Sequence, residues 1–122
     1  DVDAVLKSAV IRTSMDLRKT LYVYAGKEPG HSVEGRHAEG GAVDISRIDG
    51  VKFSLMDDAS AAALGNAIGA GIANRLPFGQ VKMVFTPGMA FRFDRPMSLE
   101  QNRALIGAHR DHVHVSVIGS TP

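Results

Sequence analysis

Five histidines gather in two parts of this chain, and a carboxylate lies close to the first group. The histidines are His31 and His37 in a glycine-rich segment, followed by His109, His112 and His114 near the last apolar segment. Asp44 follows the first group on a predicted strand. Imidazole and carboxylate groups are ligands of zinc in proteins, and the chain has no cysteine that would offer a thiolate instead. The grouping therefore predicts a metal site built from histidine and carboxylate.

The spacing of these residues is compatible with a single shared metal ion. An extended chain would hold His37 and Asp44 about 23 Å apart at ~3.3 Å per residue, so the chain must turn back between them. The adjacent glycines at 40–41 permit such a turn. His112 and His114 are two residues apart on a predicted strand and share one face, so one can bind metal while the other reaches the bound water. Three protein ligands with an open fourth position are typical of catalytic zinc, which lowers the pKa of its water to about 7.

Two short stretches carry a family resemblance. The stretch His-Ala-Glu-Gly-Gly-Ala-Val-Asp at 37–44 fits the pattern His-x-x-Gly-x-Ala-x-Asp, and His-Val-His at 112–114 fits a later His-x-His. This pair resembles the LAS metallopeptidases, which include D-Ala-D-Ala carboxypeptidases and murein endopeptidases. The longer string at 109–115 is most similar to the penicillin-insensitive murein endopeptidases. The resemblance implies zinc ligands at His37, Asp44 and His114, on the central antiparallel sheet of a small α+β domain.

Two residues compete for the role of general base. Carboxypeptidase members commonly have a Glu three residues before the last ligand, where this chain has Asp111. If the strand has already begun there, alternation places His112 on the metal face and Asp111 opposite, which favours His112 as base or transition-state stabiliser. If residue 111 still belongs to the loop, Asp111 remains an alternative.

Other polar residues flank the two motifs and are candidates for substrate binding. Arg36, His109 and Arg110 are each candidates to stabilise an oxyanion or hold a substrate carboxylate, with a solvated surface position as the alternative. Many relatives carry an Arg shortly after the strand that precedes the first ligand, where this chain offers Lys27, and relatives usually have Ser where this chain has Gly35.

The resemblance implies a zinc-dependent peptidase that cleaves amide bonds in peptidoglycan stem peptides or cross-links by attack of metal-bound water. The alternative is a non-catalytic, zinc-stabilised recognition module, because hedgehog signalling domains resemble the same family. A wall substrate places the protein in the periplasm or outside the cell, or in a phage or secreted toxin protein that delivers it to the wall.

Composition limits the remaining possibilities. At 122 residues the chain has room for one domain, and a formal charge of +1 without runs of like charge does not favour nucleic-acid binding. Apolar stretches are broken well before the ~20 residues needed to span a bilayer. The absence of an initial Met indicates a segment of a longer or processed protein. We expect a monomer.

Apolar periodicity predicts an α+β domain with a central antiparallel or mixed sheet flanked by helices. We expect helices over the first fourteen residues or so, with Val5 facing the core, from about 58 to 76, and from Ser98 with Leu99 facing inward. We expect strands near 21–25, 42–46, 51–55, 80–86 and 112–118, with Val81, Met83 and Phe85 on one face of the fourth.

Overall fold

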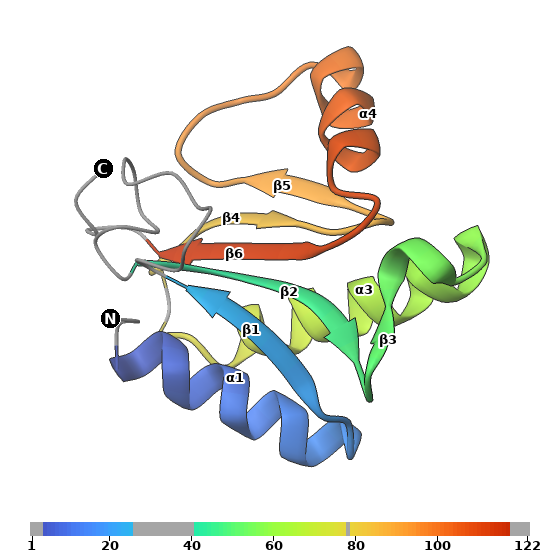
Figure 1. Cartoon of the computed structure of the whole chain (residues 1–122). Helices are drawn as coiled ribbons and strands as arrows, with labels where there is room; N and C mark the ends of the chain where they lie inside the picture. Colours follow the sequence, from blue (N-terminus) through green and yellow to red (C-terminus); the bar gives the residue numbers. More distant parts are fainter. Residues whose placement is uncertain (1–3, 26–40, 78, 118–122) are drawn as a thin grey trace.

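The computed structural model describes residues 4–25, 41–77 and 79–117, which form one antiparallel sheet with helices on both faces (Figure 1). In chain order the elements are α1 (Ala4–Leu17), β1 (Leu21–Ala25), β2 (Ala42–Ile48), β3 (Val51–Lys52), the 3-10 helix η1 (Phe53–Leu55), α3 (Asp58–Asn74), β4 (Val81–Phe85), β5 (Ala90–Arg92), α4 (Leu99–Ala108) and β6 (Val113–Val117). The strand order is β1-β2-β6-β4-β5, and β3 pairs with β2. The predicted α+β class is confirmed, and β6 lies at the centre of the sheet.

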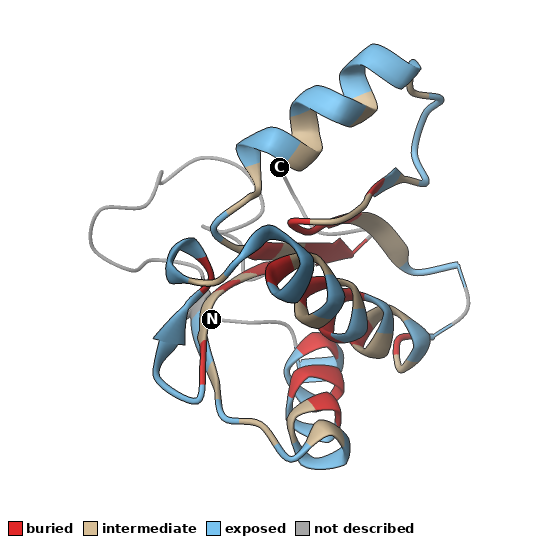
Figure 2. Cartoon of the chain, turned by 90° about the vertical axis from the view of Figure 1, so that its right-hand side faces the viewer, coloured by how far each residue is buried: buried red, intermediate tan, exposed pale blue. Residues whose placement is uncertain are grey.

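The hydrophobic core lies between the sheet and the two helices α1 and α3 (Figure 2). Alternate residues of the central strands point into it, among them Val43 and Ile45 on β2 and Val113 and Val115 on β6, all fully buried. Because side chains alternate between the two faces of a strand, the residues between these valines and isoleucines point to the other face, toward α4. The core thereby determines which polar residues face the side of the sheet that carries the candidate site.

Helix α3 lies close against the sheet at Gly69. Its N-terminus is capped by Asp57, whose side chain accepts a hydrogen bond from the Ser60 backbone N–H at 2.8 Å. A Cβ atom added at Gly69 would lie 2.8 Å from Cγ2 of Thr86 and 3.0 Å from Cγ1 of Val84. Both distances are shorter than ordinary van der Waals contact, so this crossing of helix and strand requires a residue without a side chain.

Two predicted strands differ from the structure. The strand expected at 51–55 ends after Lys52, because Phe53 turns into the core within η1 and is fully buried. The expectation that Val81 shares a face with Met83 is wrong. Val81 pairs with Val117 and Met83 with Ser116, so a bulge between them turns Val81 toward the core and leaves Met83 on the opposite face.

The structure also differs from the sequence predictions at the edge strand β5 and at two helical residues, Val5 and Leu99. β5 was not predicted, since it is only three residues long and follows a segment rich in Pro and Gly. Leu99, expected to face inward, is 67% exposed, and Val5 is 41% exposed. Helix α4 has no buried residue, because it stands over the sheet beside β5 instead of covering a core (Figure 2). In the part of the chain that the structure describes, no helix combines the length and the apolar character needed to cross a membrane.

Candidate metal centre

Asp44 and His114 lie directly opposite each other on the two central strands. β2 and β6 are antiparallel, and the Cα atoms of these two residues are register partners. The Nδ1 atom of His114 is 2.9 Å from Oδ1 of Asp44, and the two side chains are only 12% and 15% exposed. An imidazole and a carboxylate are therefore held together on the face of the sheet opposite the core, where little water reaches them.

The spacing of these two atoms is close to what one zinc ion requires. With zinc bonds of 2.0–2.1 Å and tetrahedral angles, two ligand atoms lie about 3.3 Å apart, so a small shift would allow both to bind the same ion. Within 4–25, 41–77 and 79–117 no group of three His, Asp or Glu residues is arranged to hold a metal. The predicted third ligand, His37, lies outside the described residues. The zinc site thus remains a prediction, and the positions of Asp44 and His114 are compatible with it.

His112 reaches the same place from the turn before β6. The strand begins at Val113, so Asp111 belongs to the turn, and its Oδ1 lies 2.7 Å from Nδ1 of His112. The other ring nitrogen of His112, Nε2, is 4.0 Å from Oδ1 of Asp44. When Nδ1–H donates to the Asp111 carboxylate, Nε2 keeps its lone pair and is able to accept a proton on the side of Asp44. The two competing bases are thus hydrogen-bonded to each other.

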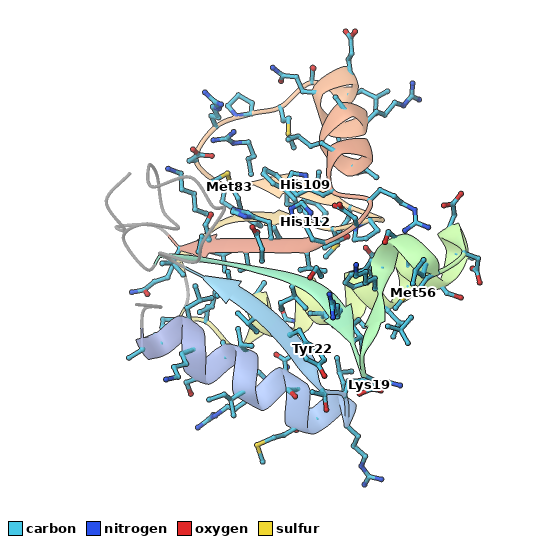
Figure 3. The ribbon with its side chains drawn as sticks, in the orientation of Figure 1. Lys19, Tyr22, Met56, Met83, His109 and His112 are labelled. Carbon is cyan, nitrogen blue, oxygen red and sulfur yellow. The ribbon has the colours of Figure 1, made fainter. Side chains whose placement is uncertain are left out.

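His109 closes the site from the C-terminal end of α4. Figure 3 shows His109 and His112 between α4 and the sheet, and their ring centroids are 4.7 Å apart. His109 donates from Nδ1 to the backbone carbonyl of Leu105 at 2.7 Å, which leaves Nε2 as the acceptor nitrogen. Burial lowers the pKa of His109 and thereby favours the neutral ring.

Phe85 packs against the rings of His109 and His114. It was not identified from the sequence as part of the site. Its ring centroid lies 4.8 Å from that of His109 and 5.8 Å from that of His114, and it is 5% exposed. Phe85 is the register partner of His114 on β4. A phenylalanine at period two in a strand is an ordinary core signal, so only the pairing of β4 with β6 reveals its position.

Arg110 connects the turn before β6 to η1 and to the N-terminal end of α3. Its Nη1 and Nη2 donate to the backbone carbonyls of Phe53 at 3.0 Å and Met56 at 2.7 Å, and its Nε donates to Oδ1 of Asp58 at 2.9 Å. These contacts favour a structural role over the predicted alternative of oxyanion or substrate binding.

We expect Arg110→Ala to lower the free energy of unfolding by about 1–3 kcal/mol, because two backbone carbonyls lose a charged donor. Thermal unfolding measures the change as a drop of several degrees in Tm. Arg110→Lys is the matched control for charge, and it should also be destabilised, since an ammonium group lacks the planar fork that reaches three acceptors. An unchanged Tm in both variants would contradict the structural role.

The remaining predicted site residues lie outside the part that the structure describes. These are the zinc ligand His37 and the substrate-binding candidates Lys27 and Arg36. The structure thus brings together Asp44, Asp111 and the three C-terminal histidines. No family model, curated protein or solved structure matches this chain.

Proposed function

We propose that this protein is a zinc-dependent peptidase that hydrolyses amide bonds in peptidoglycan stem peptides or cross-links. The observation that carries the proposal is the pairing of Asp44 with His114 on the central strands, with Nε2 of His112 4.0 Å from the same carboxylate. Two groups of the kinds that bind zinc and a third that transfers protons thus meet on one face of the sheet. The resemblance of 37–44 and 112–114 to the LAS metallopeptidases supports the substrate class.

Asp44 and His114, with His37, would hold the ion. When bound, zinc lowers the pKa of a water ligand to about 7 and polarises the carbonyl of the bond that is cut. His112 accepts the proton of the attacking water at Nε2 and returns it to the departing amine nitrogen. The Asp111 carboxylate holds the His112 ring in the tautomer that makes this transfer possible and stabilises the ring when it is charged.

His109 and Phe85 give the proposed site its shape. The neutral His109 ring, anchored to α4 through the Leu105 carbonyl, packs against His112 and keeps it between α4 and the sheet. Phe85 excludes water from below, so that electrostatic interactions of the paired side chains are stronger than in bulk water. Because the proposed substrate lies in the bacterial wall, the protein would act in the periplasm or outside the cell, or as part of a phage or toxin protein that is delivered to the wall.

Incubation of the zinc-loaded protein with purified peptidoglycan fragments tests the proposal. We expect mass spectrometry to show products that have gained one water for each cleaved amide bond, and the bond that is cut separates an endopeptidase from a carboxypeptidase. The chelator-treated protein is the control and should form no product. If zinc binds but no fragment is cleaved, the peptidase proposal is wrong and the recognition module becomes the better description.

A further inference from the structure

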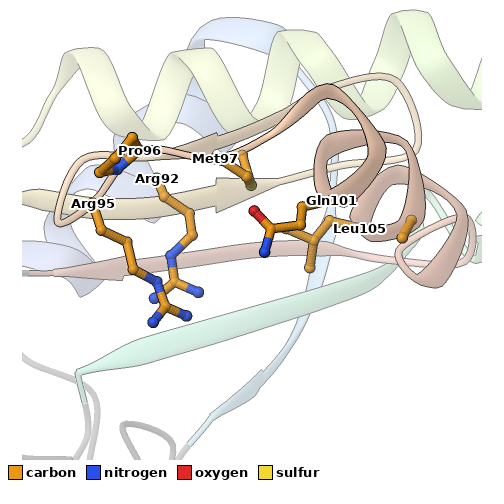
Figure 4. Close-up of a pocket in the computed structure, with 7 residues that line it drawn as sticks. Arg92, Arg95, Pro96, Met97, Gln101 and Leu105 are labelled. Atoms are coloured by element: carbon orange, nitrogen blue, oxygen red, sulfur yellow. The ribbon is translucent and has the colours of Figure 1, made fainter.

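A hollow lies between the segment that follows β5 and helix α4 (Figure 4). Its volume is about 410 Å³, and its lining includes Arg92, Arg95, Met97, Gln101 and Leu105. We call it the Arg92–Arg95 pocket. Figure 4 shows Arg92 and Arg95 among the side chains that line it. Nothing in the proposed mechanism uses these arginines.

The Arg92–Arg95 pocket carries an excess of positive charge. Arg92 donates two hydrogen bonds to the Asp94 carboxylate, at 3.1 and 3.0 Å, and Nζ of Lys82 lies 3.7 Å from the same group. The hydrogen bonds from Arg92, with the charge of Arg95 adding, lower the pKa of Asp94 and keep it ionised. None of the hydrogen bonds and ion pairs between the described residues includes Arg95, whose charge acts on Asp94 from a longer distance. One carboxylate therefore faces three cations, and Arg95 is available to an anionic ligand.

Gln101 contributes a further donor to the same pocket. Its Oε1 accepts a hydrogen bond from the backbone N–H of Ser98 at 3.0 Å, as part of the capping box of α4. Because this bond fixes the carbonyl end of the amide, the amide NH₂ group is left to donate. The polar groups that the pocket offers to a ligand, Arg95 and the Gln101 amide, are thus donors, which suits a carboxylate.

The sheet register places this pocket on the same face as Asp44 and His114. Arg92 pairs with Met83, and Met83 pairs with Ser116, which is two residues from His114 on β6. Two strand spacings of about 4.8 Å and two residues of rise put the Cα atoms of Arg92 and His114 about 12 Å apart. An extended peptide covers that distance in about three to four residues. Leu105 borders the pocket and also accepts the hydrogen bond of His109, so α4 joins the two places.

We propose that the Arg92–Arg95 pocket is an anion subsite that binds a free carboxylate of the peptide substrate, on the same face of the sheet as the bond that is cut. The assignment of this carboxylate to a substrate rests on the proposed function, whereas carboxylate binding at Arg95 and Gln101 does not. The enzyme is thereby selective for acidic peptides over the same peptides with the carboxylate masked.

The test compares a synthetic stem peptide that has a free side-chain carboxylate with the same peptide carrying a carboxamide there. Calorimetry gives Kd, and hydrolysis by the zinc-loaded protein gives kcat and KM. We expect Arg95→Gln to raise Kd and KM for the carboxylate peptide about tenfold, as the loss of one charged hydrogen bond predicts, with kcat unchanged. Both constants for the carboxamide peptide should stay the same.

Arg103→Gln is the matched control, because Arg103 lies exposed on α4 and does not line the pocket. It should leave all constants unchanged. Equal effects of Arg95→Gln on both peptides, or no effect on either, would overturn the subsite. If no peptide is hydrolysed but the carboxylate peptide still binds through Arg95, the subsite stands and the peptidase proposal fails. If both peptides are hydrolysed equally well, the peptidase proposal stands and the subsite fails.

Discussion

His114→Ala should remove zinc from the protein. The zinc content is expected to fall from about one ion per chain to near none, because a site with three protein ligands loses most of its affinity with any one of them. Replacing groups that only orient a ligand already costs about 10–100-fold in metal affinity, so loss of a ligand should cost more. His114 is 12% exposed and paired with Asp44, and Asp44→Asn should have the same effect. Metal analysis of the purified variants measures it.

Asp16→Asn is the control for these substitutions. Asp16 pairs with Arg75 at the surface of α1, far along the chain from the candidate centre, and its replacement should leave zinc content unchanged. The wild-type protein treated with chelator should lose zinc and melt at a lower temperature, yet remain folded, since its core does not depend on the ion. Full zinc content in both His114→Ala and Asp44→Asn would show that the metal centre has been assigned wrongly.

His112→Ala should separate catalysis from metal binding. We expect zinc content to stay at the wild-type level while hydrolysis of peptidoglycan fragments falls about 100-fold or more, the size of effect that loss of a proton-transfer group produces. His112 is 26% exposed, and its Nε2 lies 4.0 Å from Oδ1 of Asp44, which is beyond hydrogen-bond distance. Its removal therefore takes away a proton acceptor and leaves the paired ligands in place. Metal analysis and kcat/KM, measured on the same preparation, test both halves.

Asp111→Asn is the matched variant for His112→Ala. If the Asp111 carboxylate orients the His112 ring and stabilises its charged form, the loss of activity should be smaller than that caused by His112→Ala, because the imidazole remains and the amide oxygen of Asn is still able to accept from Nδ1–H. A nearly normal His112→Ala protein together with an inactive Asp111→Asn protein would reverse the assignment and make Asp111 the base.

Local patterns predicted the helices and most strands because these elements are specified by residues close in the sequence. Helix α3 is marked by apolar residues at helical spacing and by the Asp57 cap, and both are present in the structure. The bulge between Val81 and Met83 was not predictable in this way. It arises from how β4 pairs with β6, and a strand alone does not reveal its partner.

The residues of the candidate site likewise fall into those that local patterns identify and those that only strand pairing reveals. Asp44, His112 and His114 were identified from the residue types and the two motifs, and the structure places them together. Phe85 was missed, because it belongs to the site only through the pairing of β4 with β6. The contact between Asp111 and His112 depends on where β6 begins, a boundary that sequence patterns locate only to within a few residues.

The central position of β6 has a consequence for how the protein acquires its chemistry. Asp44 and His114 are 70 residues apart in the sequence, and they meet only after β6 has inserted between β2 and β4. The loop between two strands so far apart in the sequence must close before their contacts can form, so we expect this pairing to form late in folding. A partly folded chain therefore lacks the pairing of Asp44 with His114 on which the candidate metal centre depends. We therefore expect any activity of the candidate metal centre to appear only after the fold is complete.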